Sequence, residues 1–116
     1  MAHPLNGLAN LNYEQGKYVQ AEPLYQRALT IWEYAHGPDH SLVASPLNGL
    51  AQLYRAQGKY EQAEPLFKRA LAIREQQLGP EHPDTQIIRE NNVALLRAMG
   101  HDAEAAAIET KHMPPS

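Results

Sequence analysis

The chain repeats itself with a period of 42 residues, and this repeat restricts its fold more than any other feature. Residues 5–40 and 47–82 are identical at 23 of 36 aligned positions. A third copy is weaker but in phase, because Gly100 follows Gly58 by one period. A fixed period of this length is typical of stacked supersecondary units that cannot bury their apolar faces alone. We therefore expect an array of three such units.

Each unit is predicted to be a pair of helices. In the second copy, apolar residues recur with helical spacing over 47–54 and again over 60–71. Gly58 separates these two stripes, and Gly79-Pro80 ends the second with a residue that cannot continue a helix. No segment alternates with the period of a strand, so the sequence predicts an all-α protein.

The three units define the expected domain organisation. We predict a single domain over 1–112, with repeats at about 3–38, 41–80 and 83–112, and a disordered tail at 113–116. The third copy ends in an alanine-rich segment with few large apolar groups. That composition suits a terminal hairpin with a solvated outer face.

These residues resemble the tetratricopeptide repeat. The residues that match its pattern are Leu50, Ala51, Tyr54, Gly58, Tyr60, Ala63, Phe67 and Ala70. The 42-residue period and the strings LYRAQGKYEQAEPLFKRALAIRE and LGPEHPD resemble the kinesin light chain subclass. The resemblance implies a right-handed superhelical solenoid of antiparallel hairpins, with two full repeats and a degenerate C-terminal capping hairpin. It also implies a scaffold or adaptor that binds proteins.

The resemblance further implies a concave groove, lined by the first helix of each hairpin, that binds a peptide. The residues expected to face that peptide are Asn6, Asn10, Tyr13, Asn48, Gln52, Arg55, Glu90 and Arg97. An asparagine amide both donates and accepts, so it can hold the main chain of an extended peptide. Capture of a C-terminal carboxylate is not expected, because no lysine stands at the Asn6 and Asn48 positions. The alternative is that these residues are only solvated helix surface.

The second helix of the first copy suggests a different contact. Trp32 and Tyr34 stand where the second copy has Arg74 and Gln76. Because that position accepts arginine, we expect Trp32 to be partly exposed. Together with Tyr34 it would then support self-association of the chain. The alternative is that Trp32 folds down beside Tyr13. The second candidate function is therefore a structural module that forms homo-oligomers through its uncapped N-terminal repeat, or that packs on further repeats.

Two details of the repeat stay open from sequence. Gly7 and Gly49 lie inside predicted helices, where glycine costs about 0.5–1 kcal/mol relative to alanine. Either a close approach of a ligand or helix, or inheritance of the duplicated repeat, explains them. Asn92 replaces Leu50, which leaves open a one-residue slip of register in the third copy.

Composition and motifs argue against other functions. The net charge of −3 gives no basic stripe for nucleic acid. The chain has no cysteine, no glycine-rich phosphate loop, no nucleophile motif and no zinc motif. We therefore expect no enzyme activity, no cofactor and no metal. His36 and His40 form the only close histidine pair, and Gly37-Pro38 between them keeps them off one helix face.

Charged residues and hydropathy give two further expectations, on ion pairs and on membrane contact. The carboxylates that recur with the repeat are Glu22, Glu33, Glu64 and Glu75. Basic neighbours such as Lys68 and Arg69 favour solvated ion pairs over acid–base catalysis. No apolar run approaches the roughly 18 residues of a membrane span, and no secretory signal opens the chain. We therefore expect no membrane contact and a cytoplasmic location.

Overall fold

The computed structural model describes residues 2–111, with side chains from residue 4 to residue 109. This part of the chain contains helices and no strand, which confirms the all-α prediction. The helices are α1 (Ala2–Glu14), α2 (Tyr18–His36), α3 (Ser41–Ala56), α4 (Tyr60–Leu78), α5 (Pro83–Ala98) and α6 (Asp102–Lys111). None of them is long and apolar enough to cross a bilayer. The tail predicted at 113–116 lies outside the described residues.

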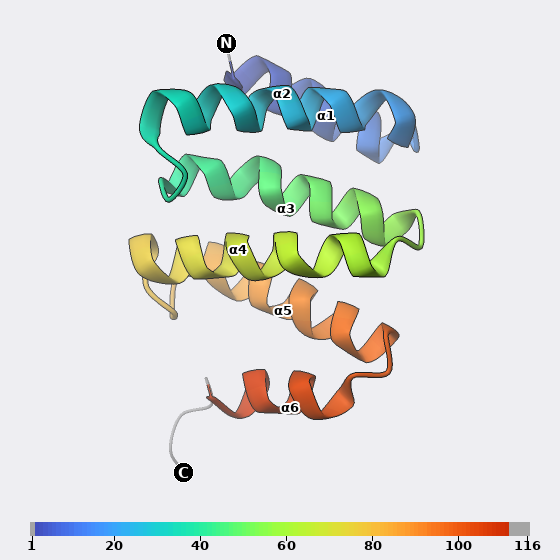
Figure 1. Ribbon diagram of the computed structural model, residues 1–116, viewed down its shortest axis with the longest axis vertical. Helices are drawn as coiled ribbons and strands as arrows, with labels where there is room; N and C mark the ends of the chain where they lie inside the picture. Colours follow the sequence, from blue (N-terminus) through green and yellow to red (C-terminus); the bar gives the residue numbers. More distant parts are fainter. Residues whose placement is uncertain (1, 112–116) are drawn as a thin grey trace.

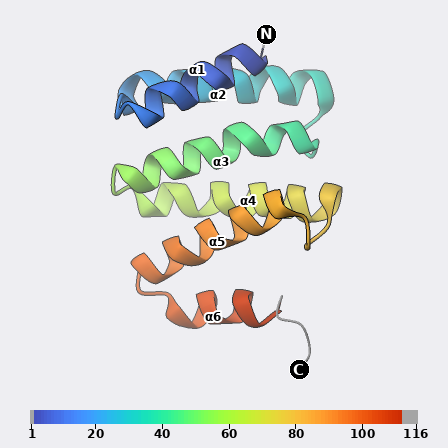
Figure 2. The same cartoon turned by 180° about the vertical axis from the view of Figure 1, so that it is seen from behind.

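The helices form three antiparallel hairpins that stack along the long axis of the molecule (Figure 1). Within each hairpin, α1 packs on α2, α3 on α4, and α5 on α6. Between hairpins, α3 packs on α2 and α5 packs on α4. Consequently α1, α3 and α5 run side by side and face the viewer in Figure 2. This side corresponds to the concave face that the resemblance implied.

The same local signals begin and end the helices in successive repeats. Gly58 has a φ of 77°, a left-handed conformation that turns the chain from α3 to α4. His40 begins α3, because its Nδ1 accepts a hydrogen bond from the backbone N–H of Leu42 at 3.1 Å. His82 caps α5 in the same way. Because these signals recur, α2 and α4 are both 19 residues long.

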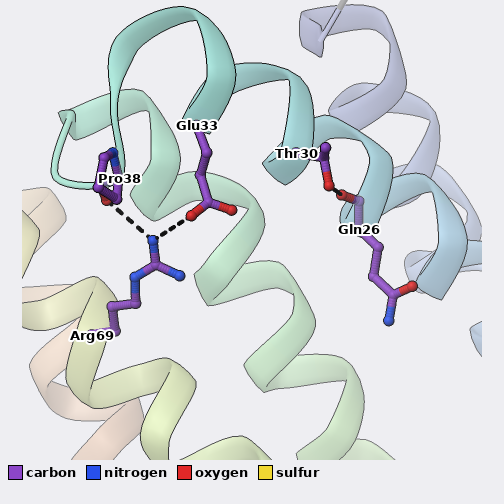
Figure 3. Close-up of polar contacts among 5 residues, drawn as sticks. All are labelled: Gln26, Thr30, Glu33, Pro38 and Arg69. Atoms are coloured by element: carbon purple, nitrogen blue, oxygen red, sulfur yellow. Dashed lines mark hydrogen bonds and ion pairs between the residues drawn. The ribbon is translucent and has the colours of Figure 1, made fainter.

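Arg69 joins the second hairpin to the loop that follows the first. Its guanidinium donates to Glu33 Oε2 at 2.7 Å and to the carbonyl oxygen of Pro38 at 3.2 Å (Figure 3). Thr30, on the same helix as Glu33, instead donates to the backbone carbonyl of Gln26 at 3.0 Å. The Arg69 and Glu33 side chains are 37% and 34% exposed. Glu33 therefore forms the solvated ion pair expected from sequence, which stabilises the fold by at most about 1 kcal/mol.

The core follows the apolar stripes of the sequence. In α3, Leu47 and Leu50 are buried, and in α4 Ala63, Phe67 and Ala70 are fully buried. The small alanines alternate with the phenylalanine, so neighbouring helices can approach closely.

The third hairpin keeps the register of the first two. Asn92 is 1% exposed at the position of Leu50, and Leu95 is fully buried one turn later. The slip that the sequence left open does not occur. Asn92 Oδ1 and Thr85 Oγ1 are buried without a hydrogen-bond partner in the described part of the chain. Since Thr85 occupies the position of the apolar Val43, the third hairpin places polar groups in a core that the second keeps apolar.

Trp32 is buried, so its predicted exposure is wrong. The side chain is 5% exposed and packs in one cluster with Val43 and Ala44 of α3. Tyr13 packs against a different cluster, the one that contains Ala9 and Tyr25. The inference failed because Arg74, at the equivalent position, is itself half-buried. An arginine covers apolar neighbours with its stem while its guanidinium reaches a polar partner, so it does not report exposure in another repeat.

Candidate functional site

A groove of about 330 Å³ runs across the first helices of the hairpins. Side chains from α1, α3, α4 and α5 line it, and most of them are polar. The lining residues are Asn6, Asn10, Ser45, Asn48, Gly49, Gln52, Arg74, Asp84, Ile87 and Ile88. The groove is therefore a polar surface with an apolar edge contributed by α5.

Four residues predicted from sequence meet in this groove. Asn6 and Asn10 lie one turn apart on α1, and Asn48 and Gln52 lie one turn apart on α3. Residues four apart share one face of a helix, and the 42-residue period puts equivalent faces of α1 and α3 on the same side of the stack. The repeat itself thus creates a row of side-chain amides.

Two of these amides have unused hydrogen-bonding capacity. The Oδ1 atoms of Asn6 and Asn48 are buried and have no hydrogen-bond partner in the described part of the chain. A buried polar atom without a partner costs roughly 1–3 kcal/mol. Neither oxygen is accessible in this conformation, so a ligand would remove the cost only if the amide turned toward the groove and then accepted a hydrogen bond from the ligand. A peptide backbone presents such N–H donors at every residue except proline.

Asn10 is already held by the protein. Tyr25 donates a hydrogen bond from its hydroxyl to Asn10 Oδ1 at 2.5 Å. Burial is the main cause that raises the pKa of Tyr25 to about 12, so the phenol keeps its proton and donates this hydrogen bond well into the alkaline range. This contact fixes the orientation of the Asn10 amide in the groove.

Arg74 is a groove residue that sequence reasoning missed. Its Nη2 donates to Ser45 Oγ at 2.9 Å, and its Nε is buried without a hydrogen-bond partner in the described part of the chain. The groove therefore contains a cation that is held in place by Ser45 and whose buried Nε–H has no partner among the described residues. The sequence did contain a signal for this residue, because Arg74 stands where the first repeat has Trp32. That difference was used to predict the exposure of Trp32 and not a polar role of Arg74.

Glu90 and Arg97 line a separate hollow of about 280 Å³ on the third hairpin. Val93 and Ala94 make much of its surface apolar. The Arg97 guanidinium pairs with Glu109 of α6, which holds it away from the asparagine groove. Six of the eight residues predicted to face a ligand are thus divided between two hollows.

Tyr13 and Arg55 line neither of these hollows. The Tyr13 ring lies 5.6 Å from the ring of Tyr18, between centroids, and packs against the cluster around Ala9. Tyr13 therefore closes the end of the first hairpin. Arg55 is half-buried near the end of α3, outside the groove.

A larger hollow, of about 680 Å³, lies at the turn between α3 and α4 and includes Glu64 and His101. Together with Glu104, these side chains bring three ligand-type atoms within 4.8 Å of one another. Lys68 Nζ lies 2.7 Å from Glu64 Oε1 and 4.0 Å from Glu104 Oε2. The hydrogen bond that the Lys68 ammonium donates to Glu64 is the main cause that raises the pKa of Lys68, and this ammonium is the cation of the cluster. We assign no metal to this cluster. The groove is the better candidate for the functional site, because its polar residues recur in successive repeats.

Stacked helical hairpins with a polar groove along their first helices define a helical repeat protein. The sequence profile of the tetratricopeptide repeat matches residues 1–76 and, in a second placement, residues 45–114. The chain belongs to the tetratricopeptide-repeat family. Such repeats are generally protein-interaction modules, and their fold is typically that of a non-enzymatic scaffold.

Solved structures of the kinesin light chain type share this fold. BtubC (BKLC) from P. vanneervenii superposes on 99% of the chain with a TM-score of 0.84 and 28% sequence identity. A kinesin light chain of nearly identical TPR-like repeats from Podosopora anserina superposes on 91% with a TM-score of 0.79 and 23% identity. The chain spans 50% of the length of each structure. No curated protein is significantly similar to it in sequence.

Proposed function

We propose that the groove binds an extended peptide segment of a partner protein, and that the chain acts as a scaffold or adaptor. The observation that carries this proposal is the pair of buried, unpartnered Oδ1 atoms of Asn6 and Asn48. Both amides stand at the same position of successive repeats, on the side of the stack where α1 and α3 lie next to each other.

The chemistry of the asparagines favours the peptide main chain over side chains as the recognised group. Each Oδ1 accepts from a backbone N–H and each Nδ2 donates to a backbone carbonyl. Neighbouring helices lie on the order of 10 Å apart, and an extended peptide rises about 3.3 Å per residue. Asn6 and Asn48 would therefore meet main-chain groups about three residues apart. Ile87, which is 52% exposed, and the guanidinium of Arg74 would add side-chain preference at one end.

The third hairpin limits what the peptide can carry. Glu90 takes the position of Asn48, and it lies in the adjacent hollow with Arg97. An anionic terminus placed there would be repelled by the Glu90 carboxylate. In the groove itself no lysine stands at the Asn6 and Asn48 positions to pair with a terminal carboxylate, so the proposed ligand is an internal segment of a chain rather than a free C-terminus.

Calorimetric titration with a peptide tests the proposal. The probe is a peptide selected by phage display against the full chain. Asn6→Ala and Asn48→Ala should each weaken it by about 1–3 kcal/mol, a factor of about 5–150 in Kd. Neither asparagine is part of the apolar core clusters, so circular dichroism should show an unchanged fold.

Gln76→Ala is the matched control, because Gln76 is an exposed amide on α4 outside the groove. It should leave Kd unchanged. Equal affinity of the wild type and the double variant Asn6→Ala, Asn48→Ala for the peptide would refute binding in the groove. Failure to select any peptide would also refute it.

The second candidate function, self-association or packing on further repeats, now depends on different residues. Tyr34 is 95% exposed, but the burial of Trp32 removes the patch that the two were expected to form. Self-association through Tyr34 alone remains a prediction. The cytoplasmic location also stays a prediction from sequence.

A further inference from the structure

Asn10 differs from the other asparagines of the groove in how its amide is held. The Oδ1 atoms of Asn6 and Asn48 have no hydrogen-bond partner in the described part of the chain, so these oxygens lose no bond when the amides turn. Asn10 Oδ1 instead accepts a hydrogen bond from the Tyr25 hydroxyl at 2.5 Å. Asn10 itself is exposed and lines the groove. Of these three amides, Asn10 is therefore the one whose oxygen is already in use.

Turning the Asn10 amide would break a buried contact. The Tyr25 side chain is only 2% exposed, so water has little access to its hydroxyl and cannot readily replace Asn10 as the acceptor. A buried hydroxyl that loses its acceptor is strongly unfavourable. Asn10 Oδ1 therefore stays directed at Tyr25, and the planar amide group then directs its Nδ2 away from the tyrosine.

The contact depends on a glycine and occurs at one repeat position. A Cβ atom built on Gly49 would lie 2.4 Å from Cε1 of Tyr25, so only glycine lets the ring pass α3 toward the groove. One repeat later, Phe67 has no hydroxyl that could hold Gln52, which stands at the position of Asn10. The groove thus has one fixed amide on α1 and a freely turning one at the equivalent place on α3.

We propose that Asn10 is a fixed hydrogen-bond donor that selects a main-chain carbonyl oxygen of the bound peptide, with Tyr25 as its positioning residue. This inference rests on the proposed binding of a peptide in the groove, and it adds which group of the peptide is recognised at α1. An amide whose oxygen is occupied offers its N–H groups to a ligand. Every residue of an extended peptide carries a carbonyl oxygen, so a main-chain acceptor is present at whichever residue crosses α1.

Alanine and aspartate at position 10 distinguish a donor from an acceptor. The probe is the display-selected peptide, titrated calorimetrically into the full chain. Asn10→Ala removes the donor and should weaken binding by a factor of about 2–13. Asn10→Asp keeps an oxygen for the Tyr25 hydroxyl but sets a second oxygen against the peptide carbonyl, so it should weaken binding at least about tenfold more. If Asn10 were an acceptor, Asn10→Asp would instead bind as tightly as the wild type or more tightly.

Gln52→Glu is the matched control for the added negative charge. It makes the same change from amide to carboxylate in the groove, but no tyrosine hydroxyl fixes the new side chain, which can turn away from the ligand. Its loss of affinity should therefore be smaller than that of Asn10→Asp. Equal losses would attribute the effect to charge alone and would overturn the proposal.

Single thioamides in the peptide identify the acceptor, because a sulfur in place of the carbonyl oxygen accepts hydrogen bonds more weakly. One thioamide should weaken binding to the wild type several-fold and have little further effect in Asn10→Ala. The same thioamide should matter less in Tyr25→Phe, because the Asn10 amide is no longer held. A purely structural role of Tyr25 would lower the stability of the chain and leave this coupling unchanged. Coupling of Asn10 to a side chain of the peptide, found by alanine substitutions in the peptide, would overturn the main-chain assignment.

The alanine variants of Asn6 and Asn48 separate this inference from the proposed function. If both weaken binding of the peptide while Asn10→Asp binds as well as the wild type, peptide binding in the groove stands and the donor role of Asn10 is refuted. If none of these variants changes Kd, peptide binding in the groove is refuted and this inference with it.

Discussion

The two helix glycines should respond to the same substitution with opposite signs. Gly7 and Gly49 have the same neighbours in sequence on both sides, Asn and Leu, and lie inside α1 and α3. Gly7→Ala should raise the free energy of unfolding by about 0.5–1 kcal/mol, because alanine is the better helix former and its methyl group meets nothing.

Gly49→Ala should lower the free energy of unfolding despite the same gain in helix propensity. The new methyl group would lie 2.4 Å from Tyr25 Cε1, so the ring must withdraw by about 1 Å to reach ordinary contact. Overpacking of this kind costs about 1–3 kcal/mol. The displaced ring also weakens the hydrogen bond to Asn10, which contributes about 0.5–1.5 kcal/mol. After the propensity gain, a net loss of about 1–3 kcal/mol remains.

Urea unfolding followed by circular dichroism measures both changes. The midpoints of Gly7→Ala and Gly49→Ala should move in opposite directions at constant slope. Changes of the same sign would refute the argument that Tyr25, rather than inheritance of the repeat, requires the glycine in α3.

Four further substitutions test the core. Thr85→Val should raise the free energy of unfolding by about 1–2 kcal/mol, because an unpartnered buried hydroxyl is removed, and Val43→Thr should lower it; equal stabilities in urea would contradict this. Ala63→Leu should lower the thermal midpoint through overpacking of about 1–3 kcal/mol, and an unchanged midpoint would show that Ala63 is not a packing position. Tyr25→Phe should lower the free energy of unfolding by about 0.5–1.5 kcal/mol at neutral pH, because the hydrogen bond to Asn10 is lost. Because the pKa of Tyr25 is raised to about 12, the stability linked to its proton is present below about pH 10 and is lost as the pH rises toward 12. The melting temperature of Tyr25→Phe should therefore depend less steeply on alkaline pH, and equal slopes would contradict the assignment.

The hairpins were predictable because their signals are local. Gly58 can adopt a left-handed turn without strain, and the stripes around Leu50 and Phe67 each bury one face of one helix. The period predicts that Asn6 and Asn48 face the same side of the stack, and the family resemblance implied that this side carries the groove.

The exposure of equivalent residues was not predictable, because it depends on the neighbouring hairpin. Gly7 and Gly49 have matching local sequence, yet only Gly49 meets a ring from another hairpin. Trp32 and Arg74 share a repeat position. Trp32 is buried in the core, whereas Arg74 extends to the groove and donates a hydrogen bond to Ser45. A repeat sequence specifies which faces can pack, and the identity of the next hairpin decides which of them do.

The central claim is that the asparagine amides of the groove hold the main chain of a peptide. A double-mutant cycle measures this directly, using the display-selected peptide, its copies methylated at single backbone nitrogens, and the wild-type and Asn48→Ala proteins. Methylation removes one N–H donor and leaves every side chain of the peptide in place. At one position of the peptide, methylation should weaken binding to the wild type by about 1–3 kcal/mol. The same methylation should cause little further loss of affinity for Asn48→Ala, which gives a coupling energy of at least about 1 kcal/mol. Strictly additive losses at every position of the peptide would contradict the claim.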